Sequence, residues 1–219
     1  SGNANIDGAI TGITTFRVTG TSDIGADITT SSTQQYDQNI TLTATSELTA
    51  STVTTNGAID GATYNLTVTG NAVFGNGTTD TLTNLGSLEV TGTTEINTTT
   101  ITTTSTQTYG GAVTLGADVT LATTNNNVSF DSTIDSDAIG SKRNLTLTLG
   151  SGTASITGAV GTTSLADIIL NSSASFTSTV TADNLTIAAS KTATVKNNVT
   201  ISSTITLNDN SVQINTYSE

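Results

Sequence analysis

The sequence predicts an all-β protein that folds as a parallel β-helix, a solenoid of about nine or ten coils. Three observations predict this fold. Apolar and polar residues alternate with a period of two along most of the chain, and the period of a helix is almost absent. The short strands defined by this alternation are separated by Gly, Asn and Asp, which tolerate tight turns. Groups of these strands also recur in the same order further along the chain.

The composition suits stacked strands better than one large globular core. The chain has 219 residues, of which 54 are Thr and 24 are Ser, and only 34% of the residues are hydrophobic. Its apolar residues are mainly Ile, Val, Leu and Ala, and β-branched side chains suit a pleated, half-buried surface. Disordered chains lack such a regular supply and are usually more charged. We therefore expect a folded chain with a narrow aliphatic interior.

Charge and missing residue types argue against several functions. The net charge is −12, with only five basic residues, so we expect no nucleic-acid partner and no binding to anionic membranes. No apolar run approaches the roughly 20 residues that cross a bilayer, so we expect no membrane insertion. The chain has no Cys, which excludes a disulfide framework and thiol-bound metals, and we expect no cofactor. It begins at Ser1 in strand-like sequence without a signal peptide, so we interpret it as a piece of a longer exported protein.

The alternation predicts the individual strands in order. Ile, Val, Leu, Ala and Phe are expected to point inward, and Thr, Ser and Asn outward. The predicted strands cover residues 16–18, 40–42, 66–68, 72–74, 88–90, 112–115, 119–121, 128–130, 145–149, 154–156, 167–170, 174–176, 185–187, 199–201, 204–207 and 212–214.

A long-range repeat organises these strands. Residues 28–42, I-T-T-S-S-T-Q-Q-Y-D-Q-N-I-T-L, closely match residues 101–115, I-T-T-T-S-T-Q-T-Y-G-G-A-V-T-L. Tyr36 and Tyr109 are equivalent in this match. Other matching pairs lie 72 to 79 residues apart, which indicates small insertions at turns. We therefore expect one solenoid segment over 1–219, with repeat units at 28–100 and 101–180 and partial units at 1–27 and 181–219.

A coil of about 20–25 residues would divide each unit into about three coils. Stacked at about 4.8 Å, the coils would form a rod near 45 Å long. Tyr36 and Tyr109 would then lie on the same side of the rod, about three coils apart. Asn125 to Asn127 are expected to form a ladder with equivalent Asn side chains above and below.

A β-sandwich, or a tandem of sandwiches, is the alternative fold, because the spacing of the strands also fits it. The absence of Trp and Pro, the short uniform strands and the small interior residues favour the solenoid, since sandwich cores usually contain bulkier anchors.

Several segments resemble the repeats of filamentous-haemagglutinin-type proteins, which are large bacterial adhesins, and of autotransporter-like β-strand-repeat proteins. They are Q-T-Y-G-G-A-V-T-L-G-A-D-V-T-L at 107–121, N-V-S-F at 127–130, N-L-T-L at 144–147 and G-A-V-G-T-T-S-L at 158–165. The resemblance is best over 101–180 and recognisable over 28–100. It implies a right-handed parallel β-helix, export across the outer membrane and display at the bacterial cell surface.

One acidic cluster is a candidate for chemistry. Asp131, Asp135 and Asp137 lie close in sequence, followed by Lys142 and Arg143. Two carboxylates can cleave glycosides, and Asp135 and Asp137 are candidate calcium ligands. The cluster lacks the Gly and bidentate Glu of a calcium loop, and the chain has no His for acid–base work. We therefore interpret it as a solvated turn and predict that the chain is not an enzyme.

Three further features offer binding or modification sites. The tyrosines could stack on sugar rings, although half-buried packing with a solvated hydroxyl is the favoured interpretation; they are Tyr36, Tyr64, Tyr109 and Tyr217. Nine N-x-S/T triplets are close to the number expected by chance; they begin at Asn39, Asn65, Asn76, Asn97, Asn127, Asn144, Asn171, Asn184 and Asn198. An internal isopeptide bond would need Lys191 or Lys196 beside Asn197 or Asn198 in an apolar core, but solvated lysines are expected.

The sequence thus predicts a structural or adhesive repeat segment of a large secreted bacterial surface protein. Its expected partners are itself, through flanking repeats or end-to-end stacking, and a glycan or protein on a host or neighbouring cell. The first alternative is a self-assembling subunit of an extracellular filament, sheath or surface layer. The remote alternative is a carbohydrate-active β-helix enzyme.

Overall fold

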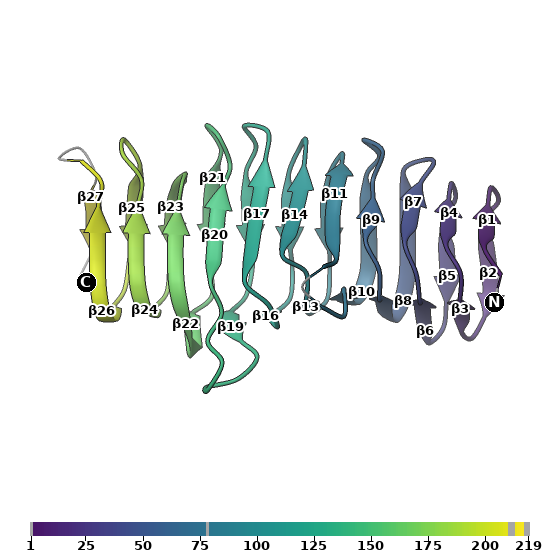
Figure 1. Cartoon of the computed structure of the whole chain (residues 1–219), viewed down its shortest axis with the longest axis horizontal. Helices are drawn as coiled ribbons and strands as arrows, with labels where there is room; N and C mark the ends of the chain where they lie inside the picture. Colours follow the sequence, from purple (N-terminus) through teal and green to yellow (C-terminus); the bar gives the residue numbers. More distant parts are fainter. Residues whose placement is uncertain (1, 78, 210–212, 217–219) are drawn as a thin grey trace.

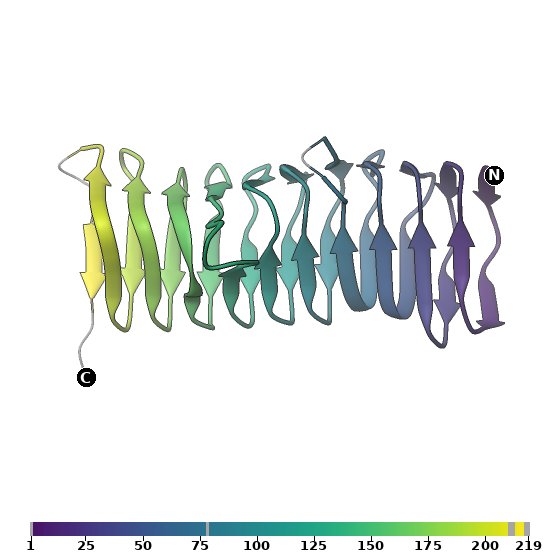
Figure 2. The same cartoon turned by 60° about the horizontal axis from the view of Figure 1, so that its bottom comes forward.

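The predicted β-solenoid is confirmed. In this computed structural model, which describes residues 2–77, 79–209 and 213–216, 27 strands join into one sheet that winds into about ten turns (Figure 1). Every pairing between these strands is parallel, as in the register of Ile101 with Leu121, which excludes the sandwich alternative. The described residues contain no helix. Figure 2 shows the turns stacked along one axis, with the first and last described strands at opposite ends of the rod.

Each turn contributes one strand position to each of three faces, which we call A, B and C. Face A contains β1 (Ala4–Ile6), β4 (Ser22–Ile24), β7 (Ile40–Leu42), β9 (Ile59–Asp60), β11 (Thr81–Leu85), β14 (Thr100–Thr103), β17 (Val119–Thr123), β20 (Leu145–Thr148), and the second halves of β22 (Val160–Leu170), β24 (Val180–Ile187) and β26 (Val199–Leu207).

Face B follows in each turn. It contains β2 (Ile10–Ile13), β5 (Ile28–Thr30), the first halves of β8 (Ser46–Thr55) and β10 (Leu66–Phe74), β12 (Leu88–Val90), β15 (Gln107–Tyr109), β18 (Val128–Phe130), β21 (Thr153–Ile156), β23 (Ser173–Phe176), β25 (Thr192–Val195) and β27 (Gln213–Thr216).

Face C completes the turn. It contains β3 (Phe16–Val18), β6 (Thr33–Tyr36), the second halves of β8 and β10, β13 (Thr94–Ile96), β16 (Val113–Leu115), β19 (Ile134–Ser136), and the first halves of β22, β24 and β26.

Inward residues form columns along the rod because each turn repeats the register of the turn before it. On face A, Leu82, Ile101, Leu121, Leu147 and Leu170 follow one another in one column, and all are buried. Outward positions beside them are largely Thr, as predicted. Alternation therefore places aliphatic side chains in the core and hydroxyls in solvent.

The long-range sequence repeat does not correspond to whole turns, which corrects our expectation. Tyr36 lies on face C and Tyr109 on face B, so they do not share a side of the rod. The two matching segments are offset by eleven strand positions along the winding. This offset is one position short of four turns, whereas the sequence predicted about three coils. The other matched pairs shift in the same way, since β3 on face C matches β12 on face B, and β9 on face A matches β19 on face C.

Side chains at the corners also link successive turns. Asn39 Oδ1 accepts a hydrogen bond from Ala58 N at 3.1 Å, and Asn127 Oδ1 accepts one from Thr153 N at 2.9 Å. Asn125 Oδ1 binds Ser151 N in the same way. The expected ladder of Asn side chains is therefore wrong in detail, because these amides bind the backbone of the next turn and not an equivalent Asn.

Most predicted strands are present, and several additional strands were not predicted. The predicted strand at 212–214 lies partly outside the described residues, which contain β27 from Gln213. Several of the unpredicted strands place polar side chains inward, such as Gln34 in β6 and Thr94 in β13, both buried. Inward polar residues break the apolar alternation, which explains why strands such as β6 and β13 escaped prediction.

We expect Leu121→Ala to lower the free energy of unfolding by about 2–5 kcal/mol, because it opens a cavity in a buried column. The matched control Thr120→Ala, at the adjacent outward position, should change it by less than about 0.5 kcal/mol. Chemical denaturation measures both. Equal losses for the two variants would contradict the inward and outward assignment.

Candidate functional site

The most distinctive internal feature is a buried polar pair that occurs twice. The repeated segment Thr-Gln-x-Tyr places Gln34 and Tyr36 inside face C, and Gln107 and Tyr109 inside face B; all four side chains are fully buried. Tyr36 donates its hydroxyl to Gln34 Oε1 at 3.0 Å, and Tyr109 donates to Gln107 Oε1 at 3.1 Å. Burial raises the pKa of both hydroxyls, so both tyrosines stay protonated.

Each glutamine also joins two turns. Gln34 Nε2 donates to the carbonyl of Ile28 in its own turn at 2.8 Å and to that of Thr49 in the next turn at 3.0 Å. Gln107 Nε2 donates in the same way to the carbonyls of Ile101 and Ala122, at 3.3 and 3.0 Å. The sequence offsets are the same at both places, so the motif keeps its geometry although it lies on a different face.

The favoured interpretation of half-buried tyrosines is therefore wrong for Tyr36 and Tyr109, and so is a spaced pair that grips a glycan. Both rings pack on aromatic neighbours: Tyr109 stacks on Phe130 with ring centroids 5.0 Å apart, and Phe16 meets Tyr36 edge-on at 6.0 Å. Tyr64 lies at a corner of the rod and is 39% exposed. Tyr217 lies outside the described residues.

The acidic cluster of the sequence does not converge on one site. Asp131 is exposed at the end of β18. Asp135 Oδ1 accepts a hydrogen bond from Thr163 N in the next turn at 2.8 Å. Asp137 instead pairs with Arg143 through two hydrogen bonds of 2.9 Å. Asp135 and Asp137 thus bind different partners, Thr163 and Arg143.

Residues 137–143 form a loop that projects from the rod between β19 and β20 (Figures 1 and 2). The loop lengthens this turn, and here β19 pairs with β22 through the single register pair Ile134 and Val160. Within this loop, Ile139 is 83% exposed, the most exposed large hydrophobic side chain of the described residues. The sequence predicted this segment as a turn and gave no signal of an exposed apolar side chain in it.

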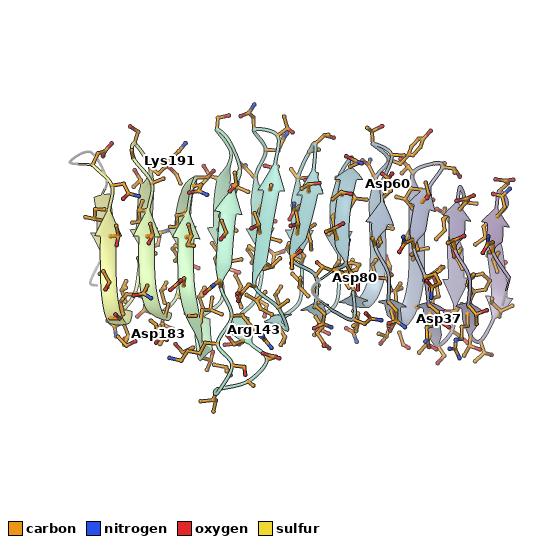
Figure 3. All side chains as sticks on the ribbon, viewed as in Figure 1. Asp37, Asp60, Asp80, Arg143, Asp183 and Lys191 are labelled. Carbon is orange, nitrogen blue, oxygen red and sulfur yellow. The ribbon has the colours of Figure 1, made fainter. Side chains whose placement is uncertain are left out.

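Ion pairs hold the base of this loop. Besides the Asp137–Arg143 pair, Lys142 Nζ pairs with Asp183, which also accepts a hydrogen bond from Ser202 Oγ at 2.7 Å. Figure 3 places Arg143 near this base and Asp183 toward the C-terminal turns. The hydrogen bonds from Arg143 lower the pKa of Asp137, and that from Lys142 lowers the pKa of Asp183. All four groups are solvent-accessible, so water screens these pairs.

Lys191 and Lys196, the lysines of the hypothetical isopeptide bond, do not lie in an apolar core. Lys191 donates from Nζ to the carbonyl of Gly150 at 3.3 Å in an exposed setting, and Lys196 is exposed. The solvated interpretation is therefore correct for both.

Two shallow grooves lie on the described surface, and the described ranges contain no candidate metal centre. One groove, of about 310 Å³, lies between the first two turns and is lined by residues 12–14 and 29–31. The other, of about 240 Å³, crosses face C beside Asn71, Val73 and Glu95. No group of three or more acidic side chains is placed to hold a metal ion in the part of the chain described. No helix there is long and apolar enough to cross a membrane.

These features define a Thr-rich parallel β-solenoid whose buried polar contacts link its own turns. Comparisons of the chain with models of protein families, with curated proteins and with solved structures found no match. The resemblance to adhesin repeats thus stays a prediction.

The Gln107–Tyr109 pair should behave as one unit. Tyr109→Phe or Gln107→Leu alone leaves a buried polar group without its partner, and each should cost about 1–3 kcal/mol of unfolding free energy. The double variant should lose less than the sum of the two single losses, measured in a double-mutant cycle. Strictly additive losses would show that the two side chains do not interact.

The projecting loop should loosen in acid. A carboxyl whose pKa is lowered in the folded chain stabilises it above the ordinary pKa of about 4, and that contribution is lost as pH falls through the lowered pKa. We therefore expect hydrogen exchange of the 137–143 amides, corrected for intrinsic rates, to rise as the pH falls through the lowered pKa of Asp137.

Asp137→Asn should show fast exchange in this loop already at neutral pH, whereas Asp131→Asn, which removes the same charge outside the loop, should behave as the parent chain. Slow loop exchange in Asp137→Asn at neutral pH would mean that the ion pair does not hold the loop.

Proposed function

We propose that this chain is a structural rod, a repeat segment of a large secreted bacterial surface protein, which acts as a stiff spacer at the cell surface. The observation that carries the proposal is continuity: three parallel ladders run from the first turn to the last described strands. A spacer needs a defined length and stiffness, and stacked turns supply both, because each turn adds a fixed rise of about 4.8 Å.

The buried chemistry supports a structural role. In the Gln34–Tyr36 and Gln107–Tyr109 pairs, each Tyr hydroxyl donates a hydrogen bond to its Gln within the core. Each Gln amide in turn donates to a backbone carbonyl of the next turn. The corner Asn residues likewise accept from the next turn. These glutamine, tyrosine and asparagine side chains are thus engaged in holding one turn on another, which favours a mechanical role over catalysis.

The outer surface suits long exposure to water. It is rich in Thr and Ser and carries a net charge of −12, which keeps neighbouring molecules apart. Contact with a host or neighbouring cell would then fall to the exceptional positions, Tyr64 at its corner and Ile139 on the projecting loop. We propose these two side chains as the places where a glycan or protein would touch the rod.

Changing the number of turns tests the spacer role. Ile40 and Leu121 lie in one inward column, four turns apart, so residues 40–120 form a block of whole turns. Duplicating this block should lengthen the rod by about 19 Å, and deleting it should shorten the rod by the same amount. Small-angle X-ray scattering measures the maximum dimension and the cross-section. An unchanged length, or a compact parent particle, would refute the rod.

A further inference from the structure

The projecting loop is an insertion at one corner of the rod, where the chain passes from face C to face A. In the two preceding turns, residues 97–99 and 116–118 are enough to join these faces. In the turn of the loop, residues 137–144 separate β19 from β20. In the turn that follows, β22 passes from face C to face A without a break. The fold therefore closes this corner elsewhere with fewer residues.

The middle of the loop lies outside the backbone ladders. Residues 138–141 are all exposed, and within the described ranges no strand of a neighbouring turn pairs with them. Ser141 N donates to the Ala138 carbonyl at 3.3 Å, which is a contact inside the loop itself. Endopeptidases bind their substrate as an extended strand through hydrogen bonds to its backbone. This exposed stretch can therefore enter a protease cleft without breaking a ladder.

Exposure of a side chain alone does not make such a site, and the corner at Tyr64 shows why. The Tyr64 side chain is 39% exposed. However, Thr63 N donates to the Asn84 carbonyl at 2.6 Å, and the Tyr64 carbonyl accepts from Gly86 N at 2.7 Å. The next turn thus holds the backbone at this corner. A protease with a large aromatic pocket would reach the tyrosine ring, but the backbone beside it is already bonded.

The base of the projecting loop is also held. Ion pairs engage the side chains of Lys142 and Arg143. Arg143 donates its backbone N–H to Ser136 Oγ at 3.0 Å, and its carbonyl accepts from Ala166 N at 2.9 Å. A trypsin-like enzyme needs a free basic side chain on a free backbone, so the two basic residues of this loop are protected from it.

We propose that residues 138–141 are a site of proteolytic cleavage, cut by an endopeptidase whose primary pocket takes a small or apolar side chain. Ala138 and Ile139 offer such side chains in the unpaired stretch, and Ile139 is 83% exposed. The reaction is hydrolysis of one peptide bond: water adds to the carbonyl carbon, the C–N bond breaks, and a carboxylate and an amine form. This inference goes beyond the structural role proposed above and does not depend on it.

A cut in the loop divides the chain without dividing the rod. The part of the chain after the loop stays bonded to the preceding turn through β20 on β17 and β21 on β18. On face C, β22 adds the single register pair of Val160 with Ile134. The two fragments are thus joined by ladders on two faces, while the covalent link between them is gone. A cut rod would remain whole at rest and part at this turn under load.

Limited digestion of the whole folded chain at neutral pH tests the proposal, with elastase, trypsin and chymotrypsin as the probes. Elastase, whose pocket takes small side chains, should make its first cut between residues 138 and 141, as located by mass spectrometry. Trypsin and chymotrypsin should act much more slowly. The two elastase fragments should co-elute in native size-exclusion chromatography and separate only in denaturant.

Variants of Gly140 test whether the free backbone decides the site. Gly140→Pro removes an N–H that the protease must bind, so the first cut should be lost. No heavy atom beyond the adjacent residues lies within 4 Å of the position that a Cβ would take there, so the fold has room for the new ring. The matched control Gly140→Ala keeps the N–H and should be cut like the parent. Circular dichroism checks that both variants are folded.

Several results would overturn the proposal. They are the absence of an elastase cut, a first cut elsewhere, and trypsin cleavage after Lys142 or Arg143 at the same rate. Equal resistance of Gly140→Pro and Gly140→Ala would overturn the role of the free backbone. Fragments that separate without denaturant would show that the ladders do not hold the cut rod together. The length of the uncut rod is independent of all these outcomes, so the structural role is tested separately.

Discussion

Parallel stacking in register is the constraint on which the rest of this structure depends. Each interior strand bonds to the turn before it and the turn after it, so a residue that points inward in one turn forces its neighbours in the column to do the same. The aliphatic columns, the outward hydroxyls and the corner Asn residues all follow from this rule. Even the buried polar pairs conform, because Gln34 and Gln107 bind carbonyls of two successive turns.

The fold class was predictable because alternation reports directly which side chains point inward. Alternation does not report on which face a strand lies. For that reason the sequence repeat was detected, but the change of face between its two copies was not. Tyr36 and Tyr109 have equivalent surroundings on different faces, a relation visible only in the pairings. Strands such as Thr33–Tyr36 were missed because buried Gln and Tyr do not look like core residues until their hydrogen bonds are known.

The candidate site was harder to predict than the fold, because carboxylates that are close in sequence do not converge on one site in the structure. Asp135 lies within β19 and Asp137 at the start of a loop, and each binds a different segment. The N-x-S/T triplets, which could be glycosylation sites, are explained by the positions of their residues in a turn. In Asn39-Ile40-Thr41 and Asn127-Val128-Ser129, a corner Asn precedes an inward aliphatic and an outward hydroxyl residue. The solenoid pattern itself thus generates many of the triplets.

The orientation of the backbone ladders has a mechanical consequence. Hydrogen bonds between turns point along the rod, so a pulling force between its ends loads them one row at a time and peels turns away, rather than shearing many rows together. Each released turn of about 20 residues could extend to about 60–70 Å. On face C, β19 and β22 are joined by the single register pair Ile134 and Val160, so this face should separate there most easily. A tether of this design would give way by steps and lengthen under load instead of snapping.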